Sequence, residues 1–278
     1  MNLSAKIASC RKIIQEADSI LIGAGAGMGV DSGLPDFRGK HGFWKAYPPL
    51  AKLGIEFEQM ANPQWFAKNP RLAWGFYGHR LNLYRSTEPH NGFRIILERL
   101  QKDKIPVFIF TSNVDGHFQK TGFAEEQIME CHGSLMHLQC TKSCGQPIWS
   151  VKSNFLMNVN SENLLADEPL PKCPQCNSLA RPNILMFSDF GWDHSRTSKQ
   201  RQNFENWLAD QKNKKLLVIE IGAGTKVPTV RHSCEEVFQS FGKSFIRINP
   251  REYECGIQGS LSLQMNAEEA IKVMNNEI

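Results

Sequence analysis

The feature that most constrains the fold is an apolar run at residues 19–22 that enters the glycine-rich segment Gly23-Ala24-Gly25-Ala26-Gly27. A strand followed directly by a glycine turn opens a dinucleotide-binding unit, in which the turn lies against a diphosphate and the next helix offers backbone N–H groups. Glycine-rich turns also occur where only tight packing is needed. The turn by itself therefore leaves both interpretations open.

Three further apolar runs, at residues 106–110, 216–221 and 245–248, have the length and continuity of buried parallel strands. Each ends in small or polar residues: Thr111-Ser112-Asn113, Gly222-Ala223-Gly224 and Asn249-Pro250. Ligands of open α/β sheets bind outside the carboxyl ends of the strands. We therefore expect the four strand ends to converge on one crevice.

The 278 residues suffice for one large domain with inserted modules. We predict an α/β fold, with a Rossmann-like parallel-sheet domain made of residues 1–42, 101–135 and 181–278. Residues 43–100 are rich in aromatic side chains and are expected to form a helical insertion. Residues 136–180 contain four clustered cysteines and are expected to form a zinc-binding module.

Charge and hydropathy narrow the class of protein. The formal net charge is only +4, from 32 basic and 28 acidic side chains, and the basic residues are scattered, which argues against nucleic-acid binding. Charged residues interrupt residues 1–20, so this segment is predicted to be an amphipathic helix and not a signal peptide. No stretch reaches the roughly 18 apolar residues of a membrane span. We expect a cytoplasmic protein without membrane association, and the oligomeric state stays open.

Four of the eight cysteines form two close pairs, Cys140/Cys144 and Cys173/Cys176. This spacing is typical of a tetrahedral, all-cysteine zinc site, and four protein ligands leave no position for a reactive water. The predicted zinc ion is therefore structural. The other four thiols are dispersed and are expected to be reduced.

The loop Gly33-Leu34-Pro35-Asp36-Phe37-Arg38-Gly39 combines an acid, an aromatic ring and a base within three residues. It offers an anion ligand, an aromatic face and a carboxylate, which is unusual for a plain connector. The alternative is a proline-stiffened loop with an Asp–Arg pair on the surface.

Two further polar motifs follow the second predicted strand. Asn113 and Asp115 lie two residues apart on a strand-end turn, where both could face a cofactor or could simply bond their own backbone. His132 has a side chain suited to taking a proton from a sugar hydroxyl near neutral pH. Most histidines are structural or exposed, but the place of His132 between the Asn113/Asp115 turn and the first metal cysteine favours a catalytic role.

In their order along nearly the whole chain, these motifs resemble those of the sirtuin family of NAD-dependent lysine deacylases. No single segment is unique, but the ordered set is highly specific. The matching segments are Gly25-Ala26-Gly27, Gly33-Leu34-Pro35-Asp36-Phe37-Arg38, Asn113-Val114-Asp115, His132-Gly133-Ser134, the two cysteine pairs, Arg181-Pro182 through Phe187, and Ile248-Asn249.

The resemblance implies that the chain binds and consumes NAD, with nicotinamide buried near Asn113 and Asp115. The acyl oxygen of a modified lysine on a protein or peptide would attack C1′ of the nicotinamide ribose. His132 would then act as general base on the ribose hydroxyls, with Asn113 as a second catalytic residue, and the acyl group would leave on ADP-ribose. The substrate peptide would pair as a strand near Phe187. The implied cofactor contacts are Gly25, Ala26, Gly27, Asp36, Phe37, Arg38, Ser112, Asn113, Asp115, Gly222, Gly224 and Asn249.

One motif bears on the acyl group. Tyr77-Gly78-His79-Arg80 resembles the Tyr-x-x-Arg pattern of sirtuins that remove malonyl and succinyl groups. Residues i and i+3 share a face of a helix, so the Tyr77 hydroxyl and the Arg80 guanidinium could grip a distal carboxylate together. The alternative is an ordinary amphipathic helix with Arg80 in solvent.

Several positions depart from the family pattern. Sirtuins usually have Ser or Thr at Gly29, Gln at Ser112, Gly-Thr-Ser at residues 222–224 and Phe-Gly-Glu at residues 187–189. Three of these changes shorten or remove hydrogen-bonding side chains in the NAD site. They leave two rival functions open: transfer of ADP-ribose to a protein or hydrolysis of NAD, and a non-catalytic NAD sensor. A base at His132 favours deacylation over ADP-ribosyl transfer.

Overall fold

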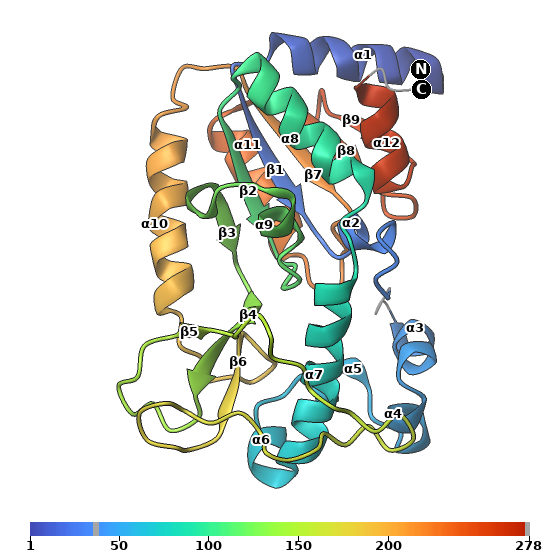
Figure 1. Cartoon of the computed structure of the whole chain (residues 1–278). Coiled ribbons are helices and arrows are strands. Elements are labelled where there is room, and N and C mark those ends of the chain that lie inside the picture. Colours follow the sequence, from blue (N-terminus) through green and yellow to red (C-terminus); the bar gives the residue numbers. More distant parts are fainter. Residues whose placement is uncertain (36–38, 276–278) are drawn as a thin grey trace.

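The computed structural model describes residues 1–35 and 39–275. Its main feature is a six-stranded sheet in the order β3-β2-β1-β7-β8-β9, in which every neighbouring pair is parallel (Figure 1). The four predicted strands form the centre of this sheet, and the chain order changes direction between β1 and β7. The strands are β1 (Ser19–Ala24), β2 (Val107–Thr111), β3 (Ile128–Glu130), β7 (Leu216–Ile221), β8 (Gly242–Ile248) and β9 (Leu261–Leu263).

Alternate residues of the central strands face two separate cores. In β1, Ile20 and Ile22 pack into one core and Leu21 into the other, because successive side chains of a strand point to opposite faces. The first face is covered by α1 (Leu3–Glu16), α8 (Asn91–Asp103) and α12 (Ala267–Met274), and the second by α10 (Ser195–Ala209) and α11 (Thr229–Ser240). Both faces are buried, which explains why the central strands are mostly apolar. The buried Glu220 of β7 and Arg247 of β8 are exceptions, and they form an ion pair at 2.8 Å. The predicted Rossmann-like fold is therefore confirmed.

Short elements complete the loops of this large domain. The helix α2 (Gly27–Val30) follows the glycine turn after β1, and α9 (His117–Thr121) and the 3₁₀ helix η1 (Glu125–Gln127) lie between β2 and β3. All three belong to connections between strands of the large sheet.

The remaining elements form a small lobe beyond the carboxyl ends of β1 and β7 (Figure 1). Its core joins aromatic side chains of the helical insertion, such as Phe43, Trp74 and Phe76, to Leu138 and Met157 of the cysteine-bearing segment. The two expected inserts therefore share one core. The lobe consists of α3 (Gly39–Ala46), α4 (Pro48–Lys52), α5 (Phe57–Met60), α6 (Trp65–Lys68), α7 (Pro70–Ser86) and an antiparallel sheet of β5 (Trp149–Ser150), β4 (Gly133–Cys140) and β6 (Ala180–Ile184).

The strands of the small lobe cross the limits that we expected from the sequence. The expected boundaries after residues 135 and 180 fall within β4 and at the start of β6, and α8, which the insertion was expected to include, packs on the large sheet. The chain therefore passes between the large domain and the small lobe within strands and helices, and not only through loops.

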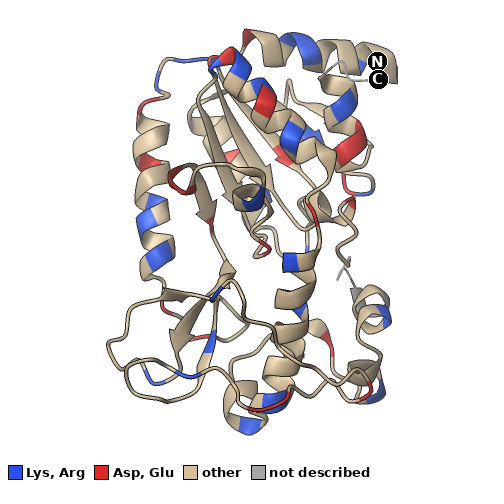
Figure 2. Cartoon of the chain, viewed as in Figure 1, with Lys and Arg blue, Asp and Glu red and all other residues tan. Residues whose placement is uncertain are grey.

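Charged side chains are distributed over both bodies. Figure 2 shows Lys and Arg on α1, α8, α10 and the small lobe, with acidic residues among them. Within the described residues, no helix is both long and apolar enough to cross a membrane.

The contact between α7 and the segment before the second cysteine pair depends on glycine. A Cβ atom on Gly75 would lie 1.8 Å from the carbonyl oxygen of Leu164, so the two backbones touch. Hydrogen bonds extend this contact on both sides: Ala166 donates to the Arg71 carbonyl at 2.9 Å, and Asn82 donates to the Met157 carbonyl at 2.7 Å.

We predict that Gly75→Ala lowers the free energy of unfolding by about 2 kcal/mol, because the methyl group forces these backbones apart. Urea unfolding followed by circular dichroism measures this. Gly191→Ala is the control, since a Cβ there meets nothing within 4 Å and the expected change is under about 0.5 kcal/mol. Equal effects of the two substitutions would contradict the packing argument.

Candidate active site

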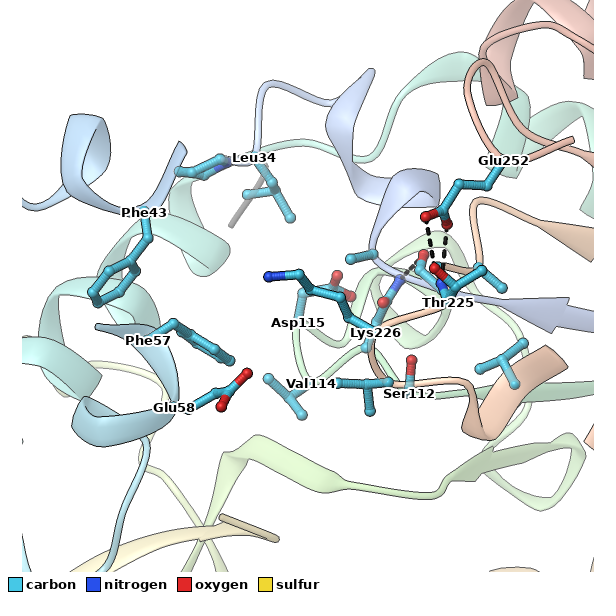
Figure 3. Close-up of a pocket in the computed structure, with 18 of the residues that line it drawn as sticks. Leu34, Phe43, Phe57, Glu58, Ser112, Val114, Asp115, Thr225, Lys226 and Glu252 are labelled. Atoms are coloured by element: carbon cyan, nitrogen blue, oxygen red, sulfur yellow. Dashed lines mark hydrogen bonds between the residues drawn. The ribbon is translucent and has the colours of Figure 1, made fainter. Parts of the chain in front are cut away.

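A cavity of about 520 Å³ opens where the large sheet meets the small lobe. Residues that follow all four predicted strands line it, so the expected convergence of the strand ends is confirmed. The helical insertion closes the other side with Phe43, Phe57 and Glu58 (Figure 3). The residues predicted from the sequence that line the cavity are Gly25, Ala26, Arg80, Ser112, Asn113, Asp115, Phe187 and Gly224.

Five other predicted residues are described but do not line this cavity: Gly27, Tyr77, His132, Gly222 and Asn249. Asp36, Phe37 and Arg38 lie outside the described residues.

The glycine turn serves both purposes that its sequence allowed. A Cβ on Gly25 would lie 2.5 Å from Cα of Ala223, and a Cβ on Gly222, which has φ +64°, would lie 2.5 Å from the carbonyl carbon of Gly27. The ends of β1 and β7 therefore touch, and only glycine permits this. Gly25 also lines the cavity. Tight packing and access for a ligand are thus combined in one turn.

The turn after β2 is fixed by its own side chains. Asn113 donates from Nδ2 to the Gly25 carbonyl at 3.0 Å, and its N–H donates to Thr111 Oγ1 at 3.0 Å. Asp115 accepts from the His117 N–H at 2.9 Å. Both residues are therefore turn formers as well as cavity residues, and Asn113 ties the second strand end to the glycine turn.

His132 lies directly behind the cavity wall. Its Nε2 is 3.4 Å from Thr229 Oγ1, and it makes a hydrogen bond with the backbone of Ser112, which lines the cavity. Burial lowers the pKa of His132 below its ordinary value, and the bond with Ser112 offsets part of this shift. The imidazole is therefore neutral at pH 7 and able to accept a proton. The contact with Thr229, from α11, was not foreseen from the sequence.

The small lobe brings Arg80 into the cavity. Only 7 % of Arg80 is exposed, so the interpretation of α7 as a helix with Arg80 in solvent is wrong. Its Nε and Nη2 donate to the Tyr84 hydroxyl at 3.1 and 2.7 Å, and the guanidinium lies 5.3 Å from the ring centre of Phe76. We missed Tyr84 in the sequence, although its i, i+4 spacing from Arg80 pointed to this contact.

Tyr77 takes a different place from Arg80. Its ring stacks on Phe66 with centroids 5.8 Å apart, and 1 % of the residue is exposed. The buried hydroxyl makes no hydrogen bond with any residue of the described ranges 1–35 and 39–275. The structure therefore brings Arg80, but not Tyr77, to the cavity wall.

The loop after β6 is stabilised by the buried side chain of one of its own residues, Asp189. Asp189, whose side chain is fully buried, pairs with Arg181 and accepts from the backbone N–H groups of Met186 and Gly191 at 3.3 and 3.2 Å. The N–H of Phe187 donates to the Ala61 carbonyl at 2.9 Å. This geometry aims Phe187 at the cavity and joins the loop to the helical insertion.

The four predicted metal ligands come together at one point. Their sulfur atoms lie within 4.8 Å of one another, with Cys140–Cys176 and Cys144–Cys173 each 3.6 Å apart. Tetrahedral zinc, with bonds of about 2.3 Å, places its sulfur ligands about 3.8 Å apart. The four thiols are thus positioned to bind a structural zinc ion. The site links the end of β4 to the segment before β6.

We predict that Cys173→Ser removes bound zinc and lowers the unfolding temperature, because closing the metal site fixes the loops that carry Cys140 and Cys144. Elemental analysis and thermal unfolding measure the two effects. Cys255→Ser, outside the cluster, is the control and should keep its zinc. Unchanged thermal stability after loss of the metal would refute a structural role.

Known proteins share this architecture. The solved structures titled "Crystal structure of a Sir2 homolog-NAD complex" and "Sir2 homologue S24A mutant-ADP ribose complex" are each 26 % identical to the chain with a TM-score of 0.69. The first match covers 97 % of this chain and 92 % of the other, and the second covers 100 % and 96 %.

Relatives by sequence agree with the structural neighbours. An NAD-dependent protein deacylase from Thermococcus sibiricus is 31 % identical over 64 % of this chain, and sirtuin-5 from Canis lupus familiaris, also named an NAD-dependent protein deacylase, is 32 % identical over 67 %. The matches span only 63 % and 61 % of the lengths of these two relatives. A deacylase from Leptospira interrogans serovar Lai is 29 % identical, over 92 % of this chain and 91 % of its own length.

The family model described as "Sir2 family" matches residues 25–228, a segment that contains the glycine turn, the turn after β2, His132 and the four cysteines. This match covers most of the chain and includes the metal site and all described lining residues of the cavity except Val230, Arg251 and Glu252. The chain therefore belongs to the Sir2 family.

Proposed function

We propose that the protein is an NAD-dependent protein-lysine deacylase that releases nicotinamide and O-acyl-ADP-ribose. The observation that carries this proposal is the single cavity that joins the glycine turn after β1 to the buried Arg80 of the small lobe. A dinucleotide on the sheet side and an acylated side chain on the lobe side would meet within this space. Relatives named NAD-dependent protein deacylase support the assignment.

The residues have distinct roles in this reaction. Gly25 and Ala26 would lie against the dinucleotide, and Asn113 and Asp115 would surround the nicotinamide, whose departure leaves C1′ of the ribose open to the acyl oxygen. His132, kept neutral by burial, would take a proton from a ribose hydroxyl so that the acyl group moves to the sugar. The NAD supplies the activated ribose carbon, and the protein holds the two reactants together.

Arg80 favours an acidic acyl group such as succinyl or malonyl. Its guanidinium lines the cavity and is oriented by the Tyr84 hydroxyl. A planar guanidinium binds a carboxylate through two parallel hydrogen bonds. The Tyr77 hydroxyl, three residues earlier and buried without a hydrogen-bond partner among the described residues, would be a second donor if the ligand brings the two side chains together.

The decisive experiment is product analysis. The wild-type protein is mixed with NAD and a panel of acetyl-, malonyl- and succinyl-lysine peptides, and the products are identified by mass spectrometry. Acyl-ADP-ribose is expected. Free ADP-ribose, or protein carrying ADP-ribose, in place of this product would favour the rival transferase or hydrolase. An absence of any product despite NAD binding would favour a non-catalytic sensor.

We predict that His132→Ala lowers kcat at least about 100-fold while NAD still binds, as measured by calorimetry. In the wild type, the neutral form of His132 is the active form, so kcat/KM should fall as the pH drops through the pKa of this residue. Because burial lowers that pKa, the fall should lie below pH 6.5. An acid limb above pH 6.5, or loss of NAD binding in the variant, would contradict the assignment.

We predict that Arg80→Met lowers kcat/KM for succinyl-lysine peptides at least about 10-fold more than for acetyl-lysine peptides, since only the former offer a carboxylate. Arg85→Met is the matched control, because Arg85 lies on the same helix but bonds the carbonyl of Phe155 and does not line the cavity. The control should leave the ratio of the two activities unchanged. Equal losses of activity on both peptides in Arg80→Met would refute the proposal that Arg80 binds the acyl carboxylate.

A further inference from the structure

The amine of Lys226 stands inside the cavity. Lys226 belongs to the loop between β7 and α11, and Figure 3 shows its side chain extending across the cavity, away from Thr225 and Glu252. No hydrogen bond or ion pair joins the amine to another residue in the part of the chain that the structure describes. An ammonium group on the wall of a binding cavity is a natural partner for an anion.

The backbone around the glycine turn offers few free donors to an anion. The N–H of Gly25 donates to the Ile221 carbonyl at 2.9 Å, and the N–H of Gly27 donates to the Gly222 carbonyl at 3.0 Å. The next two N–H groups, of Met28 and Gly29, donate to carbonyls of the same turn at 3.0 and 3.2 Å. Four backbone donors of the turn and of the helix after it are therefore already engaged, and the N–H of Ala26, which lines the cavity, is left for a ligand.

The loop that bears Lys226 is also short of free donors. Ala223 and Gly224 have no polar side chain. The Thr225 hydroxyl donates to Glu252 at 2.8 Å, and the Thr225 N–H donates to the same carboxylate at 3.0 Å (Figure 3). Lys226 is therefore the residue of this loop whose side chain remains available to a ligand.

The carboxylates around the cavity would repel a bound anion, so a positive charge is required near it. Among the described residues, four carboxylates line the cavity, from Glu56, Glu58, Asp115 and Glu252. An anion bound among them requires a positive charge nearby, since like charges repel strongly in a partly enclosed space. Two other cations also line the cavity: Arg251, which follows β8, and Arg80, which lies on the opposite side at the small lobe and bonds Tyr84.

We propose that Lys226 binds the diphosphate of the nicotinamide dinucleotide. This inference rests on the proposed use of NAD. It adds a charged side chain to the backbone contacts that the glycine turn would make with the dinucleotide. The ammonium group would supply a positive charge and N–H donors to a loop whose Ala223 and Gly224 have no hydrogen-bonding side chain. Binding of the diphosphate should then weaken when this side chain loses its charge.

The test is calorimetric titration of Lys226→Met and the wild type with ADP-ribose and with adenosine, which lacks the diphosphate. The variant should bind ADP-ribose at least about 10-fold more weakly, and its affinity should depend less on salt, because the loss is electrostatic. Adenosine binding should be the same in both proteins. Lys226→Arg should restore most of the affinity for ADP-ribose.

Lys199→Met is the matched control, since Lys199 is exposed on α10 and does not line the cavity. It should leave both affinities unchanged. If Lys226→Met binds ADP-ribose as tightly as the wild type does, the proposal is overturned. It is also overturned if this variant loses only the affinity for a succinyl-lysine peptide, because the charge would then serve the acyl carboxylate. A wild type that binds neither NAD nor ADP-ribose would instead overturn the proposed function itself.

Discussion

The structure depends on the close contact between the ends of β1 and β7. Gly25 donates its N–H to Ile221, and Gly222 lies so near Gly27 that a single Cβ would clash with the backbone. Asn113 then bonds the Gly25 carbonyl and draws the end of β2 to the same place. Three loops that are far apart in the sequence thereby form one wall. A larger side chain at either glycine would separate the loops and open the cavity to solvent.

The sequence predicts the central strands and their glycine-rich ends well, because short stretches of sequence determine these features. A strand buried on both faces is mostly apolar, as the β1 and β7 segments are apart from Ser19 and Glu220, and its glycine-rich end marks a close approach of backbones. The edge strands β3 and β9 were not foreseen, since three residues carry too little periodicity to distinguish a strand from a loop. The four cysteines were predicted for a similar reason: metal ligation requires a fixed spacing along the chain.

The small lobe is harder to predict because its order comes from contacts between distant segments. Helix α7 is buried on several sides, by other helices of the insertion on one and by residues 157–166 on another. A helix covered in this way has no single apolar stripe, so spacing along the sequence does not tell which residue reaches the cavity. Tyr77 and Arg80 are both buried, yet only Arg80 lines the cavity. The difference depends on Phe66, which stacks on Tyr77 from another helix.

Ala223 and Gly224 lack the hydroxyl groups that the family resemblance led us to expect, but the loop at residues 222–225 has a fixed conformation. Arg231 and Asn249 both donate to the Ala223 carbonyl, at 3.1 and 2.9 Å, and Glu252 holds Thr225 from the other side. These side chains come from α11 and from the segment after β8, so the protein itself fixes the shape of the loop. A loop that is already ordered costs less conformational entropy when a ligand binds. The departures from the family pattern therefore remove side-chain hydroxyl groups from this wall, while contacts within the chain fix its shape.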